Sequence, residues 1–148
     1  MFNSNISVKG NLKVVLTDSS GVVKDKREIN NLVVSSGLAF IASRMKDTTD
    51  DAMSYMAIGT GTTAAAAGDT TLGTELDRNA LTSTTVSDNV TTYVASWAAG
   101  DGTGAITEAG IFNDASSGTM LARTVFDVVN KGANDSLTVT WSINISAV

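Results

Sequence analysis

Three acidic residues, Glu75, Asp101 and Glu108, are the side chains of this sequence best suited to chemistry. Two carboxyl groups at a suitable separation can share acid, base or nucleophile roles, as they do in glycoside hydrolysis. Sugar-active sites also use aromatic platforms, yet this chain is only 5% aromatic. Its two tryptophans, Trp97 and Trp141, stand in alternating patterns that predict core positions. A carboxylate enzyme is therefore a minor alternative.

Glu108 has a simpler structural explanation. It precedes the apolar stretch Ala109 to Phe112, and a charge in such surroundings needs a partner. Only three basic residues follow residue 46, and two of them, Arg78 and Arg123, are candidates for that partner. We therefore expect a structural Glu–Arg bridge at Glu108 in preference to a catalytic acid.

The absence of two residue types excludes most other reactive sites. The chain has no histidine, so it has no Ser-His-Asp triad and no imidazole that titrates near neutral pH. It has no cysteine, so thiolate nucleophiles, disulfides and cysteine metal sites are also excluded. We accordingly predict no catalytic, cofactor-binding or metal-binding residues and no enzymatic activity.

Two loops carry weak ligand signals. Residues 47–51 (DTTDD) are acidic, but they lack the ligand spacing and the glycine of an EF-hand loop, so we expect a solvated loop and not a calcium site. Residues 59–63 (GTGTT) lead into four alanines and Gly68. Without the lysine of a P-loop they do not form a phosphate cradle. We expect a mobile surface loop that contacts a neighbouring protein.

The net charge of −5 is unevenly distributed. Residues 1–46 hold seven basic and three acidic groups, whereas residues 47–148 hold three basic and twelve acidic groups. An acidic main body would repel nucleic acid, so no nucleic-acid partner is expected. No apolar run approaches membrane-spanning length, and the first ten residues lack the apolar core of a secretory signal.

The pattern of apolar residues predicts a mainly β protein. Residues 6–17 alternate, a DSSG turn follows, and residues 22–34 return as the second strand of a basic N-terminal hairpin. Its lysines are expected on a solvated face. Residues 35–45 have the spacing of one short helix, with Leu38, Ile41, Ala42 and Met45 as its apolar stripe and Ser35 or Ser36 as its cap.

Further strands are predicted at residues 53–58, 90–98, 105–113, 119–129 and 137–146. The last is the clearest, with five apolar residues alternating with hydroxyl and amide residues. Seven or eight strands with one helix near 36–46 predict an antiparallel β-sandwich or flattened barrel. The chain is expected to be one domain, 1–148, with a hairpin at 1–34 and a helix and main sheet body at 35–148.

Four segments together resemble a known family. They are Tyr55 to Gly61; Thr71-Leu72 with Glu75-Leu76 and Arg78; Ile106 to Asn113; and Met120 to Ala122. Their order is similar to that of "MAVGDG", "L..E..R" and "REIGLFD" in the N-terminal domain of phage tail-collar and tail-fibre proteins. The chain looks still closer to small virion structural proteins of tailed phages. The similarity runs from about Gly37 to Ile145.

The resemblance implies a β-rich, commonly oligomeric attachment module of a phage particle, made in the host cytoplasm. Tail-fibre proteins continue into a shaft and a receptor-binding tip, whereas this sequence ends after its last strand, and the lysine-rich hairpin is not part of the collar pattern. We therefore expect an accessory protein that decorates or cements the capsid and binds other virion proteins, as a homo-oligomer such as a trimer. The alternatives are a tail-fibre, collar or baseplate adaptor, and a carbohydrate- or receptor-binding module.

Overall fold

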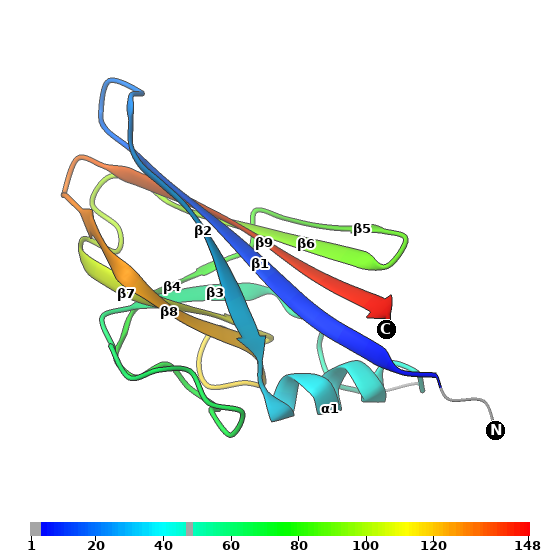
Figure 1. The fold of residues 1–148 in the computed structure, drawn as a ribbon. Coiled ribbons are helices and arrows are strands. Elements are labelled where there is room, and N and C mark those ends of the chain that lie inside the picture. Colours follow the sequence, from blue (N-terminus) through cyan, green and yellow to red (C-terminus); the bar gives the residue numbers. More distant parts are fainter. Residues whose placement is uncertain (1–3, 47–48) are drawn as a thin grey trace.

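The computed structural model describes residues 4–46 and 49–148, and in these residues it has nine antiparallel strands and one short helix (Figure 1). The helix is α1 (Ser35–Ser43). The strands are β1 (Ile6–Thr17), β2 (Val23–Val33), β3 (Tyr55–Gly59), β4 (Glu75–Ala80), β5 (Ser83–Ser87), β6 (Val90–Trp97), β7 (Gly104–Phe112), β8 (Met120–Lys131) and β9 (Ser136–Ala147). With 56% of residues in strands and 6% in the helix, the predicted mainly β class is confirmed.

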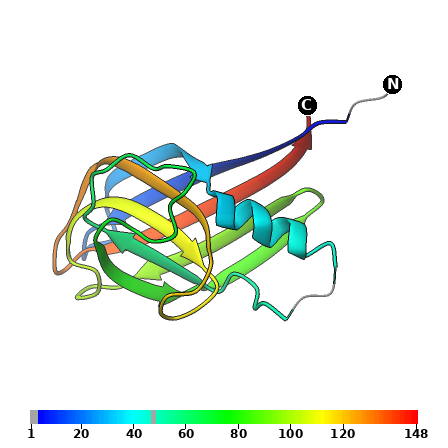
Figure 2. The ribbon, with the colours of Figure 1, turned by 90° about the horizontal axis from the view of Figure 1, so that it is seen from below.

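The strands form one curled sheet in the order β4-β3-β7-β8-β2-β1-β9-β6-β5. The sheet bends into a half-barrel, so that β4-β3-β7-β8 faces β1-β9-β6-β5 across the core (Figures 1 and 2). The bend lies where β2 meets β8, whose pairing joins Leu32 to Arg123 and Val33 to Ala122. In the described part of the chain, no helix has the length and apolar character needed to cross a membrane.

Alternation along the strands builds the core, as the sequence predicts. In β9 the inward residues Leu137, Val139, Trp141 and Ile143 are all buried, and Trp97 of β6 is buried as well. Burying five large apolar side chains of this kind contributes on the order of 10 kcal/mol before the entropy of ordering them is subtracted. The two tryptophans therefore belong to the core and not to a surface platform.

The N-terminal hairpin is part of this sheet. β1 pairs with β2 on one side and, from Ile6 to Thr17, with β9 on the other. Asp18 accepts hydrogen bonds from the backbone N–H of Ser20 and Val22, which forms the predicted turn. The lysines of the hairpin lie on its outer face, as expected, and Lys24 forms an ion pair of 2.8 Å with Asp135.

The helix packs differently from its predicted stripe. Leu38 and Met45 are 47% and 90% exposed and Ala42 is exposed as well, so these three stripe positions are wrong. Ile41 does contact the core as predicted, and Phe40, which is outside the predicted stripe, contacts it too. The predicted serine cap is also wrong. Val34 occupies the cap position, and the hydroxyl of Ser36 donates to the Met120 carbonyl 2.7 Å away.

Candidate functional site

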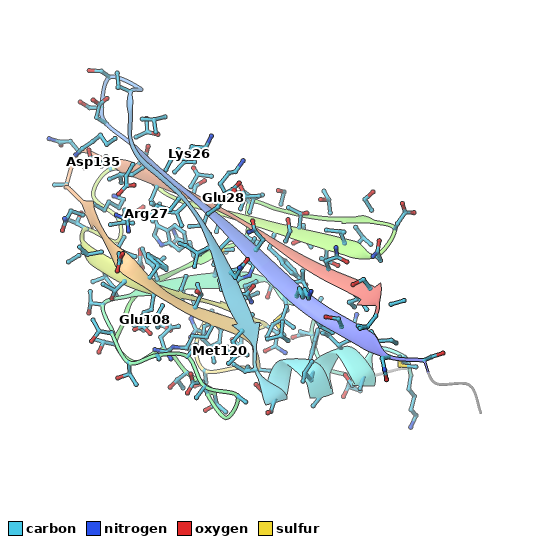
Figure 3. All side chains as sticks on the ribbon, viewed as in Figure 1. Lys26, Arg27, Glu28, Glu108, Met120 and Asp135 are labelled. Carbon is cyan, nitrogen blue, oxygen red and sulfur yellow. The ribbon has the colours of Figure 1, made fainter. Side chains whose placement is uncertain are left out.

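A buried carboxylate, Glu108 of β7, is the centre of the most elaborate polar cluster in the described residues. Its Oε1 accepts hydrogen bonds from the backbone N–H of Gly61 at 2.9 Å and of Thr74 at 2.7 Å. Its Oε2 accepts one from the backbone N–H of Gly73 at 2.9 Å. Figure 3 shows Glu108 on the side of β7 that faces the loop between β3 and β4. One side chain thus ties both ends of this loop, residues 60–74, to the sheet.

Arg123 of β8 completes the cluster. Its Nε and Nη2 donate to Glu108 Oε2 at 3.2 and 2.8 Å, and its Nη1 forms an ion pair of 2.8 Å with Asp69. Nη2 also donates to the carbonyl of Thr63 at 2.9 Å. Arg123 is 2% exposed, so water contributes little to its solvation and the protein supplies the partners. The predicted bridge from Glu108 to an arginine is confirmed, and of the two candidates, Arg78 and Arg123, the partner is Arg123. Arg123 also holds the middle of the loop.

Two glycines allow the loop to approach the carboxylate so closely. A Cβ atom added to Gly61 would lie 2.5 Å from Glu108 Oε1, and one added to Gly59 would lie 2.3 Å from the Thr74 carbonyl oxygen and 2.6 Å from Glu108 Oε1. Real Cβ atoms do not approach neighbours at such distances. The glycines that superficially suggest a phosphate loop are therefore needed because an internal carboxylate occupies the space.

The electrostatics favour the charged forms of all three side chains. Burial raises the pKa of Glu108, but the hydrogen bonds from Thr74, Gly73, Arg123 and Gly61 together outweigh it and lower that pKa below its ordinary value. Burial likewise opposes the charge of Arg123, yet Glu108 and Asp69 raise its pKa overall. The backbone N–H of Ala66, followed by Arg123, lowers the pKa of Asp69.

The arrangement around Glu108 suits a structural link between the sheet and the loop better than it suits a catalytic acid or base. A general acid must hold a proton at working pH, whereas Glu108 is held ionised, and a general base needs an accessible oxygen. Both of its oxygens already accept hydrogen bonds from the protein. The backbone N–H groups of the loop do form an anion-binding nest. The anion in that nest is the protein's own carboxylate.

The other two candidate carboxylates, those of Glu75 and Asp101, do not belong to the cluster around Glu108. Glu75 of β4 lies across β3 from Glu108, since both pair with Gly59, but its carboxylate forms an ion pair of 2.6 Å with Arg78. The guanidinium of Arg78 also stacks 3.8 Å from the ring centre of Phe112. Arg78 is therefore the ion-pair partner of Glu75 and not of Glu108. Asp101 lies exposed in the turn between β6 and β7.

The acidic loop after the helix falls partly outside the described residues, because its first two positions, 47 and 48, are not described. The backbone carbonyl of Asp50 accepts a hydrogen bond from Arg44 at 3.0 Å, and that of Asp51 accepts one from Asn113 at 3.1 Å. Within residues 4–46 and 49–148, no group of three or more Asp or Glu side chains is placed to hold a metal ion.

The loop above the cluster presents small side chains to solvent. Its residues from Thr62 to Ala67 are exposed, apart from the half-buried Ala65, and none of them carries a charge. The backbone N–H of Ser35 donates to the Ala67 carbonyl at 2.8 Å, which ties the loop to the helix as well. Leu72, near its far end, is 6% exposed and packs in the small core cluster of Phe112 and Met120. The loop that the sequence predicts to be mobile is therefore anchored at its ends and middle.

The segments that carry the family resemblance meet in this one region. Tyr55 to Gly61 forms β3 and the loop start, Ile106 to Asn113 covers most of β7, and Met120 to Ala122 begins β8. These strands are neighbours in the sheet, with β4 beside them. The sequence does not single out Asp69, whose only signal is its position in a loop with few other charges.

Comparisons with known proteins identify no relative of this chain. Scans against protein-family models, curated proteins and solved structures each gave no match to this chain.

Proposed function

We propose that this chain is a non-enzymatic structural protein of a bacteriophage particle, and that it binds other virion proteins through the exposed loop of residues 60–74. Within this class we favour an accessory protein that decorates or cements the capsid. The alternative within the same class is an adaptor in the tail fibre, collar or baseplate.

The observation that carries this proposal is the anchored loop. Its exposed stretch from Thr62 to Ala67 has small uncharged side chains, while Glu108 and Arg123 hold the backbone beneath it. A surface loop that is ordered before binding loses less conformational entropy when a partner covers it. Small side chains also let a partner's backbone approach closely. These are properties of a docking surface.

The chemistry of the cluster supports binding in preference to catalysis. The charges of Glu108 and Arg123 are satisfied within the protein, and each is at most 2% exposed. Perturbed pKa values often mark reactive sites, but structural ion-pair networks perturb them too. Here the lowered pKa of Glu108 accompanies hydrogen bonds that serve the loop. The resemblance to phage attachment domains then supplies the kind of particle.

A carbohydrate- or receptor-binding module is the second alternative, and it finds less support. Sugar sites use exposed aromatic faces, and both tryptophans of this chain are buried. The outer face of β9 and β6 does carry paired hydroxyls, such as Thr92 with Ser142 at 3.3 Å. Glycan arrays probed with the purified protein test this alternative directly.

The loop can be tested on particles that lack this protein. Ala66→Arg places a long charged side chain on the exposed part of the loop, and Asn11→Arg adds the same side chain on the outer face of β1 as a matched control. We expect the wild type and the Asn11 variant to bind such particles in co-sedimentation, and the Ala66 variant to lose binding. Equal binding by both variants, or no binding by the wild type, would refute the docking loop.

A further inference from the structure

The two edges of the sheet are unlike each other. β4, at one edge, carries Glu75, Asp77 and Arg78, whereas β5, at the other, has the uncharged sequence STTVS. All five residues of β5 are exposed, and its register with β6 is unbroken. Edge strands are ordinarily protected from pairing by charges, proline or bulges, and β5 has none of these. Figure 1 shows it as the outermost strand beside β6.

One hydrogen bond establishes which backbone groups of β6 face β5. The N–H of Ile145 donates to the Asn89 carbonyl at 3.0 Å, while the residues directly opposite each other are Val90 and Asn144. In an antiparallel ladder this pattern marks Val90 and Asn144 as a pair that does not exchange hydrogen bonds. Odd-numbered residues of β6 therefore direct their backbone groups toward β9, and even-numbered residues direct theirs toward β5.

The free edge of β5 follows from this alternation. Thr85 lies opposite Thr92, an even-numbered residue, so the backbone N–H and C=O of Thr85 point toward β6. The same groups of Thr84 and Val86 then point away from the sheet. Among the residues that the structure describes, no other strand pairs with this edge.

We propose that β5 pairs antiparallel with β5 of a second copy of this chain, about a two-fold axis at Thr85. This register places Thr84 of one copy opposite Val86 of the other, in both directions. It forms four hydrogen bonds and uses both outward groups of each of these residues in each copy. The two half-barrels become one continuous sheet with an isologous interface.

The side chains of β5 also fit a second copy. In this register Thr85 meets Thr85 and Ser83 meets Ser87 on the outer face, so no like charges oppose each other. On the inner face, Val86 is 71% exposed beside a groove of about 330 Å³. The groove is bordered by Thr84, Val86, Tyr93, Phe40, Ile41 and Met53. Val86 of the second copy lies against Thr84 and covers part of this groove.

The inference stands apart from the proposed function, because it concerns the purified protein alone. The chain has no cysteine, so single cysteines can report the register. At the axis, Thr85→Cys brings two Cα atoms to about 4.5 Å, the spacing of a pair without mutual hydrogen bonds and within disulfide range. Ser87→Cys is the matched control on the same face, since its two copies would lie about 13 Å apart or more.

We expect Thr85→Cys to form a disulfide-linked dimer under mild oxidation, and Ser87→Cys to remain monomeric on a denaturing gel. A mixture of Ser83→Cys and Ser87→Cys proteins should form the mixed dimer, because these positions are opposite each other in the register. Equal cross-linking of Thr85→Cys and Ser87→Cys, or no cross-linking of Thr85→Cys, would overturn the proposed pairing.

Sedimentation supplies a test without cysteines. We expect the wild type to sediment as a dimer, with twice the chain mass of 15.2 kDa. Val86→Lys should shift it to the monomer, whereas Leu76→Lys, on the charged edge strand β4, should leave the dimer intact. A wild-type monomer at the highest workable concentration, a trimer, or a dimer that survives Val86→Lys would each overturn the inference, and the last would indicate a different interface.

Discussion

Arg123 directs two donors, Nε and Nη2, at a single oxygen of Glu108, Oε2. The other oxygen, Oε1, is left to the backbone N–H of Gly61 and of Thr74. The Glu108 carboxylate therefore binds a cation of the sheet, Arg123, through one oxygen and the two ends of the loop of residues 60–74 through the other. Because these bonds form in the protein interior, the loop and the ion pair should lose their order together.

The first prediction concerns the charge of Glu108. Glu108→Gln leaves the buried Arg123 with a weakened partner, so we expect the free energy of unfolding to fall by about 3 kcal/mol. Glu75→Gln is the matched control, since its ion pair with Arg78 is partly exposed and should cost less than about 1 kcal/mol. Urea denaturation of both variants measures the difference. Equal losses would contradict the central place of Glu108.

The cluster also predicts how stability depends on pH. The pKa values of Glu108 and Asp69 are lowered in the folded state, so the unfolded chain binds more protons in acid. Their contribution is complete above the ordinary carboxyl pKa values of about 4 and is lost as pH falls through the lower folded values. Urea titrations from pH 6 to lower pH should show this loss, and Glu108→Gln should reduce it. An unchanged acid dependence in the variant would argue against the assignment.

The close approach of the loop to Glu108 predicts that alanine substitutions at two of its glycines differ in their effect on stability. Gly61→Ala puts a Cβ atom 2.5 Å from Glu108 Oε1, and we expect a loss of about 1–3 kcal/mol as the packing adjusts. A Cβ atom on Gly68, in the same loop, meets nothing within 4 Å, so Gly68→Ala should change stability little. Thermal unfolding followed by circular dichroism compares them. Similar melting temperatures for the two variants would be inconsistent with the geometry described.

A fourth prediction concerns the bend of the sheet. Beyond the short β2–β8 pairing, the Arg27 guanidinium donates to the backbone carbonyls of Asp127 at 2.6 Å and Val128 at 2.9 Å. It thus joins two strands that diverge. Arg27→Met removes these bonds and should cost about 1–2 kcal/mol. Lys26→Met, on the outer face, is the control.

Hydrogen exchange locates the effect of the Arg27 variant. Amides of β2 and of β8 near the bend should exchange faster in Arg27→Met than in the wild type, while those of β6 should not. Uniformly faster amide exchange throughout the sheet would show that Arg27 contributes to global stability and not to the bend where β2 meets β8.

The sequence predicts much of the fold because alternation reports burial directly. The ten-residue alternation around Trp141 becomes the buried face of β9, and the turn at Asp18 forms as its residue types imply. β4 and β5 were missed. β4 has charges in place of an apolar face, and β5 has no buried residue at all, so neither follows the pattern that marks a half-buried strand.

The site was predictable only in part. The apolar surroundings of Glu108 and the scarcity of basic residues together indicated a bridge to Arg78 or Arg123. Which arginine it was depends on strand order, which alternation does not determine. The loop contacts depend on backbone N–H groups, which every residue carries and no residue type reveals. The same limitation explains why the glycines at 59 and 61 resemble a ligand loop.

The central claim, a structural role in a phage particle, is tested most directly by mass spectrometry of purified particles after heads and tails are separated. The account predicts this polypeptide in the particles, in hundreds of copies with the heads if it decorates the capsid. A dozen or fewer copies with the tails would move it to the adaptor position. Its absence from both fractions would contradict the claim.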